Sequence, residues 1–212
     1  MSADTEVGIP LIDFAPFLTN DAKEQQQIAQ QIYHACRTVG FLYLKNHGIS
    51  EEAIAQTFTQ ARSFFDLPMS EKQQVAWSSE NSNRGYVGIE RERLDESQPG
   101  DLKEAFNVGR ELSSNTQDPT LMTNRWPAGH PMFQQRITRF FEECTIGAQR
   151  VLRAFAIALS LPPDALTKHH QNHGYTLRLL HYPPLRTSPK SGQIRAGAHS
   201  DYGSLTLLFL DQ

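Results

Sequence analysis

The chain has 212 residues, which is enough for one domain with a sizeable core, with or without an appended subdomain. Its formal net charge is -3, and 39% of its residues are hydrophobic. This balance excludes a strongly basic nucleic-acid-binding protein, and no polybasic cluster indicates a membrane surface.

Further features of the composition concern the compartment. Residues 1–10 lack the positive start and apolar stretch of a signal peptide, and no apolar run approaches the roughly 20 residues that span a bilayer. The two cysteines, Cys36 and Cys144, fall inside helical patterns, so buried free thiols are predicted. We therefore expect a cytoplasmic protein that uses neither a membrane nor nucleic acid as a partner.

The N-terminal residues alternate between short strands and helices. Residues 9–14 predict a strand, and Asp21 is placed to cap a helix, with Glu24 in capping-box register. Gly40 can end this helix in the left-handed conformation. A second strand is predicted at 41–45, before the turn Asn46-His-Gly48.

Two more helices are predicted before a region of loops. One follows Ser50 and ends at Pro68, and a short one begins at Ser70. Residues 78–129 are rich in Ser, Asn, Gly, Asp and Pro, which predicts loops with short strands such as 106–108.

A long helix and a β-rich segment complete the chain. Pro131 is suited to the first turn of a helix, and an apolar stripe continues until Pro162-Pro163. Strands are predicted at 175–182, 194–198 and 204–210. Helices followed by β-structure indicate an α+β fold.

The last predicted strand lies at the end of the sequence. Leu205-Thr-Leu-Leu-Phe-Leu210 has the character of a core strand, and three strands cannot close a barrel or complete a two-sheet sandwich. We therefore expect a truncated chain, or one that another polypeptide completes.

His199 and Asp201 are the most informative polar residues. Two residues apart on a strand, they lie on one face and can occupy adjacent positions around a metal ion. With a second histidine they would form a facial triad that leaves positions open for a keto acid and O2. A surface loop with a hydrogen-bonded pair is the alternative. The small residues before the pair, with Gly203 and an apolar strand after it, favour a site at the mouth of a β-barrel.

The segment His199-Ser-Asp201-Tyr-Gly-Ser-Leu-Thr206 resembles the metal-binding strand of the 2-oxoglutarate/Fe(II)-dependent oxygenases, in the isopenicillin-N-synthase-like family. Six further segments resemble the same family in the expected order: Ile9–Phe14, Gly40–Ile49, Phe64–Pro68, Arg84-Gly-Tyr86, Leu102–Phe106 and Leu177–Pro184. Several ordered matches are far more specific than any one of them.

The resemblance implies a fold and a domain division. It implies a double-stranded β-helix (jelly-roll) core, of which this chain holds the helical N-terminal region and the first strands. Residues 1–120 would be the N-terminal region of a non-haem dioxygenase, and residues 121–172 a long helix and connection that pack on the core. Residues 173–212 would begin the catalytic jelly-roll domain.

The resemblance also implies an activity and its residues. The activity is a dioxygenase that uses Fe(II), 2-oxoglutarate and O2 to oxidise, by default to hydroxylate, a small molecule. His199 and Asp201 would bind the iron, and Tyr182 would contact 2-oxoglutarate. The third ligand, a histidine, and the Arg-x-Ser that holds 2-oxoglutarate would follow Gln212. Plant-type members often carry Asn where this chain has Leu180.

Other residues have ordinary interpretations. Arg84 and Tyr86 could bind substrate at the mouth of the site or pack within a loop. His47 is predicted to make local hydrogen bonds in its turn. Lys103-Glu104 is interpreted as a surface or strand-end pair. A cluster near a helix end is not interpreted as a zinc site; it consists of His169, His170 and His173.

Three alternatives remain open at the level of sequence. The chain could be a catalytically inactive fragment or interaction module of this fold. It could be an Fe(II) oxidase of the same family that does not use 2-oxoglutarate. It could also be a cupin-like metal-binding protein without oxygenase activity, because a fold does not decide a function.

Overall fold

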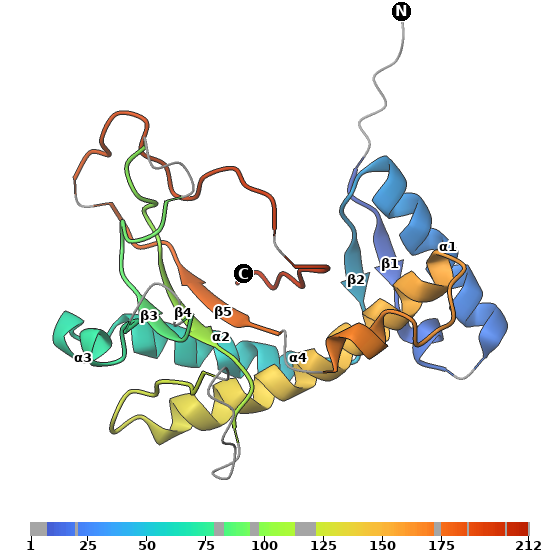
Figure 1. Ribbon diagram of the computed structural model, residues 1–212, viewed down its shortest axis with the longest axis horizontal. Coiled ribbons are helices and arrows are strands. Elements are labelled where there is room, and N and C mark those ends of the chain that lie inside the picture. Colours follow the sequence, from blue (N-terminus) through green and yellow to red (C-terminus); the bar gives the residue numbers. More distant parts are fainter. Residues whose placement is uncertain are drawn as a thin grey trace, which may run out of the picture. The chain divides into compact units, whose positions relative to one another are not determined.

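The structure is a computed structural model, and it describes residues 8–19, 21–78, 83–93, 98–112, 122–171, 175–185, 187–201 and 203–211. Figure 1 labels the helices and main strands. In chain order the elements are β1 (Leu11–Asp13), the 3-10 helix η1 (Ala15–Leu18), α1 (Ala22–Thr38), β2 (Tyr43–Lys45), α2 (Glu51–Phe65), α3 (Met69–Gln74), β3 (Gly85–Val87), β4 (Glu104–Val108), α4 (Pro131–Ala158), the 3-10 helix η2 (Thr167–His170) and β5 (Leu177–His181).

The chain packs into two compact units. The first contains residues 1–51 and 143–174, and the second contains residues 52–142 and 175–212. The long helix α4 therefore contributes residues to both. Within the described ranges, none of the helices combines the length and the apolar character that a bilayer crossing requires.

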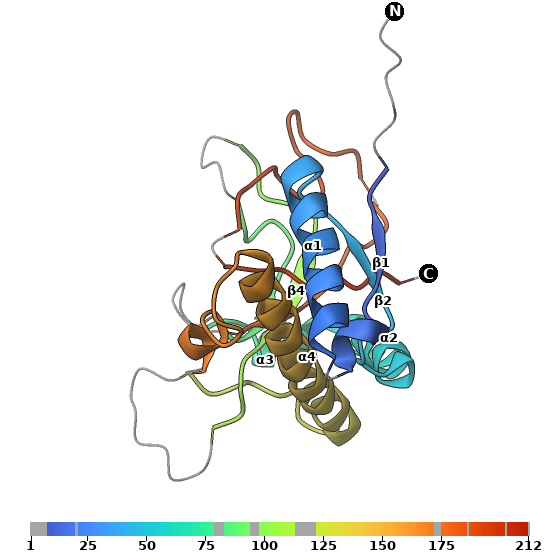
Figure 2. The same cartoon turned by 90° about the vertical axis from the view of Figure 1, so that its right-hand side faces the viewer.

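The first unit contains a two-stranded parallel sheet, in which β1 pairs with β2 and Ile12 lies opposite Leu44. Parallel strands need a crossover connection, and α1 provides it. Figure 2 shows α1 running beside both strands. The buried face of α1 carries Ile28, Ala29, Ile32 and Ala35.

Local signals set both ends of α1, as the sequence predicted. The carboxylate of Asp21 accepts hydrogen bonds from the backbone N–H groups of Lys23 and Glu24, at 2.8 and 3.0 Å. These bonds satisfy two donors that have no partner inside the helix. At the other end, Gly40 has a φ of 83° and its N–H donates to the carbonyl of Ala35.

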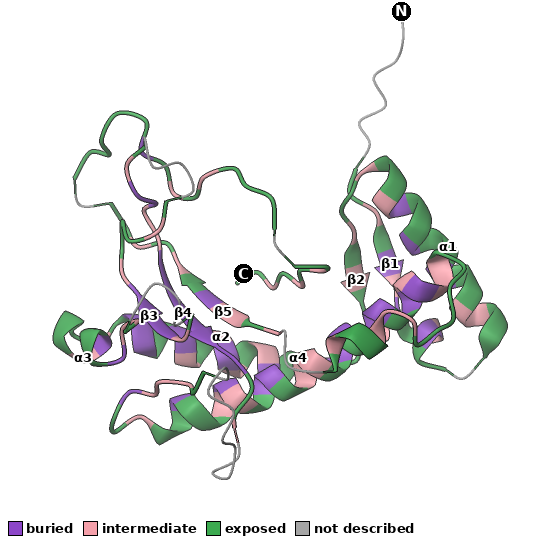
Figure 3. Cartoon of the chain, viewed as in Figure 1, coloured by how far each residue is buried: buried purple, intermediate pink, exposed green. Residues whose placement is uncertain are grey.

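The second unit is organised around a three-stranded antiparallel sheet with β4 in the centre, between β3 and β5. Every residue of β4 is buried, so the strand is purple along its length in Figure 3. The apolar and the polar side chains on both faces of β4 are therefore all buried.

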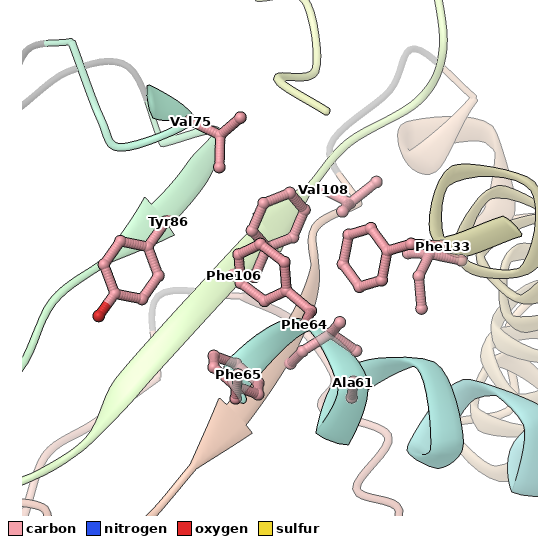
Figure 4. Packing of buried hydrophobic residues seen from close by; sticks show 10 residues of the cluster. Ala61, Phe64, Phe65, Val75, Tyr86, Phe106, Val108 and Phe133 are labelled. Atoms are coloured by element: carbon pink, nitrogen blue, oxygen red, sulfur yellow. The ribbon is translucent and has the colours of Figure 1, made fainter. Parts of the chain in front are cut away.

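The core of the second unit is an aromatic cluster (Figure 4). The ring of Phe64 lies 4.7 Å from that of Phe106 and 4.9 Å from that of Phe133, between ring centroids. Such ring pairs add specific contacts to the burial of apolar surface. The buried members of the cluster are Ala61, Phe64, Phe65, Val75, Tyr86, Phe106, Val108, Phe133, Ile137 and Leu179.

Several sequence predictions are confirmed by these elements. Strands form within 9–14, 41–45 and 175–182, and helices begin close to Ser50, Ser70 and Pro131. The thiols of Cys36 and Cys144 are both free, as predicted, but both residues are partly exposed rather than buried. The pKa of the Cys144 thiol is raised to about 12, chiefly by burial and then by the charge of Glu143.

Other predictions about the fold are wrong. Residues 194–198 and 204–210 are not strands, because a strand requires a ladder of hydrogen bonds and neither segment has one among the described residues. Strand β3 was not predicted, since three residues are too few to show an alternating pattern.

Candidate metal centre

The segment that leads to His199 is attached to the loop before β4. The N–H of Leu102 donates to the carbonyl of Ile194 at 3.0 Å, and the side-chain amide of Gln193 donates to the carbonyl of Gly100 at 3.0 Å. The N–H of Gly197 donates to Oδ1 of Asp101 at 3.1 Å. Residues 193–197 are thus held against the loop that leads into the central strand of the sheet.

His199 and Asp201 lie together at the end of this segment. The Nε2 atom of His199 is 3.3 Å from Oδ1 of Asp201, and the two side chains are 45% and 54% exposed. The Nδ1 atom of His199 lies 2.9 Å from the carbonyl oxygen of Gly197. The hydroxyl of Thr206 donates to Oδ2 of Asp201 at 2.6 Å, which leaves Oδ1 directed at the imidazole.

These contacts define what the pair can bind. A carbonyl oxygen only accepts hydrogen bonds, so Nδ1 of His199 carries a proton. In the neutral ring, Nε2 then directs a lone pair at an oxygen of Asp201, which only accepts when it is ionised. Two acceptors at 3.3 Å repel each other unless a proton or a metal ion lies between them.

The donor atoms suit a metal ion of the first transition series. Two ligands at about 2.1 Å from a metal and at right angles are about 3 Å apart, close to the observed separation. One imidazole nitrogen and one carboxylate oxygen are two members of the facial triad of non-haem iron sites. No group of three metal-binding side chains gathers among the described residues.

The other predicted site residues are placed separately. Tyr182 follows β5 and is 45% exposed. Within the described part of the chain, no hydrogen bond or ion pair joins His199 or Asp201 to Tyr182, Arg84 or Tyr86.

Arg84 and Tyr86 take packing positions. The guanidinium of Arg84 donates to the carbonyl of Asn83 at 2.7 Å, and its burial lowers its pKa. Tyr86 is 1% exposed, and burial followed by the neighbouring carboxylate of Glu104 raises the pKa of its hydroxyl. These positions favour the packing alternative over substrate binding for both residues.

Glu104 does lie at a strand end, since β4 begins there, but the interpretation of Glu104 as a surface residue is wrong. Its carboxylate is buried in β4 and accepts hydrogen bonds from Lys72 at 2.9 Å, Tyr86 at 2.6 Å and His181 at 2.8 Å. Burial opposes its ionisation, but these bonds outweigh burial and keep the pKa of Glu104 below its usual value. The alternation of a strand, which puts Glu104 on the face of Phe106, was the signal that could have revealed this.

Two other histidines make local contacts. The N–H of Ile49 donates to Nδ1 of His47 at 3.2 Å, which confirms the local hydrogen bond in the turn. The Nδ1 atom of His170 contacts the carbonyl of Leu166 at 2.7 Å, at the end of η2. His173 lies outside the described residues.

Comparison with known proteins relates the chain to one family. The family described as "non-haem dioxygenase in morphine synthesis N-terminal" matches residues 9–129. The 2-oxoglutarate-dependent dioxygenase frbA of Dothideomycetidae sp. (strain 11243) is 32% identical over 97% of this chain and 64% of its own length. Petromyces alliaceus proline hydroxylase buaE is 32% identical over 94% of this chain and 63% of its own length.

A solved structure shows the same fold. A full-length Neurospora crassa protein, crystallised in complex with alpha-KG, superposes with a TM-score of 0.76 and 33% identity, over 92% of this chain and 62% of the Neurospora chain. The same Neurospora protein has also been crystallised with alpha-KG and thymine. The chain thus spans less than two thirds of the length of each of these relatives. It belongs to the non-haem dioxygenase family within the 2-oxoglutarate/Fe(II)-dependent oxygenase superfamily.

Proposed function

We propose that His199 and Asp201 are two protein ligands of Fe(II) in a 2-oxoglutarate-dependent dioxygenase. The observation that carries this proposal is the 3.3 Å contact between Nε2 of His199 and Oδ1 of Asp201. The hydrogen bonds from His199 to Gly197 and from Thr206 to Asp201 leave Nε2 and Oδ1 facing each other, and a cation bound to both atoms would remove their repulsion.

Each residue has a separate task in the proposed site. The carbonyl of Gly197 fixes the tautomer and the ring plane of His199, and the hydroxyl of Thr206 fixes the carboxylate of Asp201. Bound Fe(II) supplies the redox chemistry by which O2 and 2-oxoglutarate are consumed. Tyr182, accessible beyond the end of β5, is proposed to donate a hydrogen bond to a carboxylate of 2-oxoglutarate.

The substrate is proposed to be a small molecule, and hydroxylation of a C–H bond is the proposed outcome. Relatives support the class, since one is named a proline hydroxylase and the Neurospora protein has been crystallised with thymine. Proline and thymine are therefore suitable first probes. Turnover of these two probes tests the proposed substrate class. Metal titration tests the proposed ligands without a substrate.

We further propose the domain division predicted from sequence. Residues 1–120 are the N-terminal region, residues 121–172 the long helix and its connection, and residues 173–212 the beginning of the jelly-roll domain. The family match over residues 9–129 supports the first of these parts. Cytoplasmic location remains a prediction of the sequence.

The test of the proposed function combines metal binding with turnover. Fe(II) or Mn(II) is titrated into the protein, and succinate release is measured with 2-oxoglutarate. We expect Asp201→Ala to lose both metal binding and succinate release while its far-UV circular dichroism is unchanged, because the side chain is 54% exposed and packs little.

The matched control is Ser200→Ala, which alters the exposed residue between the two proposed ligands. This variant should bind metal as the unmodified protein does. Metal affinity and turnover that survive in Asp201→Ala would remove Asp201 from the site.

A further inference from the structure

We propose that the buried carboxylate of Asp101 is a positioning residue for the metal ligand His199, acting through the backbone of Gly197. The inference rests on the proposed function, because it concerns how one proposed ligand is held. Asp101 lies in the loop before β4, and it was not identified from the sequence.

Burial and polar contacts hold the side chain and backbone of Asp101 in a fixed position. It is 6% exposed, and its Oδ2 atom forms a short ion pair with Nζ of Lys103, a side chain that is 11% exposed. Its own backbone is also fixed, since its N–H donates to the carbonyl of Glu92 at 2.8 Å and its carbonyl accepts from Glu90 at 3.0 Å. The remaining oxygen, Oδ1, therefore has a defined location beside the sheet.

That oxygen binds the residue that orients His199. Oδ1 of Asp101 accepts from the N–H of Gly197 at 3.1 Å, and the carbonyl of Gly197 accepts from Nδ1 of His199 at 2.9 Å. Gly197 is thus held by Asp101 through its N–H group, and it holds His199 through its carbonyl group. The chain of contacts runs from Lys103 through Asp101 and Gly197 to the imidazole.

Glycine makes this support necessary. A glycine backbone has more conformational freedom than any other, so the carbonyl of Gly197 would sample more directions without its anchor. If that carbonyl turned away, Nδ1 of His199 would lose its acceptor and the ring its preferred tautomer. The Nε2 lone pair would then be directed at the metal position for a smaller fraction of the time.

The expected effect is on metal affinity. Loss of a partner that orients a ligand typically weakens metal binding about 10- to 100-fold. Asp101 acts one residue further away than such a partner, so we expect a loss of roughly 10-fold in Asp101→Ala.

The experiment measures binding without turnover. The dissociation constant for Mn(II) is obtained by calorimetry in the absence of 2-oxoglutarate, and the tautomer of His199 is read from nitrogen-15 NMR of the metal-free protein. The unmodified protein should show the proton on Nδ1 of His199. Asp101→Ala should bind Mn(II) roughly 10-fold more weakly and show a mixture of tautomers.

Two further variants separate positioning from packing. Ser200→Ala is the control, because this exposed residue lies outside the chain of contacts from Lys103 to His199. It should keep its affinity. The double variant Asp101→Asn with Lys103→Gln keeps an acceptor facing Gly197 without burying an unpaired charge, and it should restore most of the affinity.

The outcomes distinguish this inference from the proposed function. If His199→Ala binds Mn(II) as tightly as the unmodified protein, the proposed function itself fails. If His199→Ala weakens binding but a folded Asp101→Ala does not, only the positioning role is overturned. Should Asp101→Ala fail to fold, the tautomer of His199 in the unmodified protein still tests the inference. A proton on Nε2 of His199 would contradict it.

Discussion

Replacing Glu104 by glutamine is expected to destabilise the second unit by about 3–5 kcal/mol. The substitution keeps the size of the side chain but removes its charge. The ammonium of Lys72, which is 6% exposed, then loses its counter-ion while it remains buried. A buried charge without a partner is among the most destabilising features of a folded protein.

The contacts of Glu104 support a value in this range. Three donors converge on its two oxygens, from Lys72, Tyr86 and His181, at distances of 2.6–2.9 Å. A glutamine side chain has only one acceptor oxygen, and its amide would direct N–H groups at one of these donors. The loss is a large part of the about 5–15 kcal/mol that stabilises a typical protein.

Urea denaturation followed by tryptophan fluorescence measures the effect. The control is Glu71→Gln. Glu71 precedes Lys72 in α3, and its partly exposed pair with His130 should contribute only about 0–1 kcal/mol. Adding Lys72→Met to Glu104→Gln should recover much of the loss, because the unpaired charge is then gone. A loss below about 1 kcal/mol in Glu104→Gln, no larger than the control, would refute the assignment of a buried ion pair.

Three further predictions follow from single contacts. Because folding lowers the pKa of Glu104, the ionised carboxylate stabilises the folded state above the usual carboxyl pKa of about 4.3. This stabilisation is lost as pH falls through the lowered pKa. The free energy of unfolding should therefore decrease below about pH 4.3, and it should decrease less in Glu104→Gln. Asp21→Ala should cost about 1 kcal/mol in urea denaturation, since it removes the N-cap of α1, and an unchanged midpoint would contradict that role. Tyr182→Phe should raise the KM for 2-oxoglutarate by a factor that corresponds to roughly 1.5–3 kcal/mol, whereas an unchanged KM in the turnover assay would show that the hydroxyl does not touch the cosubstrate.

The helices were predictable because their signals are local. The ends of α1 depend on Asp21 and Gly40, which act within a few residues of themselves. The stripe of α4 depends on the helical repeat, and its buried members Phe133, Ile137 and Phe140 follow that repeat. Neither inference needs information about the rest of the chain.

The spacing of His199 and Asp201 predicted that they lie close together, and they do, although the strand on which that prediction rested does not form. The strand predicted at 204–210 shows the limit of this kind of inference. Leu205, Leu207 and Phe209 are less exposed than their neighbours, as alternation predicts, and Phe209 contacts Phe140 at 5.3 Å. A ladder, however, depends on a partner from elsewhere in the chain, which alternation cannot supply.

Sequence alone therefore determined the helices, the strands β1, β2 and β5, and the closeness of His199 to Asp201. Only the tertiary structure decided the environment of two carboxylates. The partners of Glu104 come from α3, β3 and β5, and Asp101 reaches a glycine 96 positions away. Burial turns such carboxylates from solvated charges into fixed acceptors, and burial depends on which distant segments the fold brings to the two faces of β4.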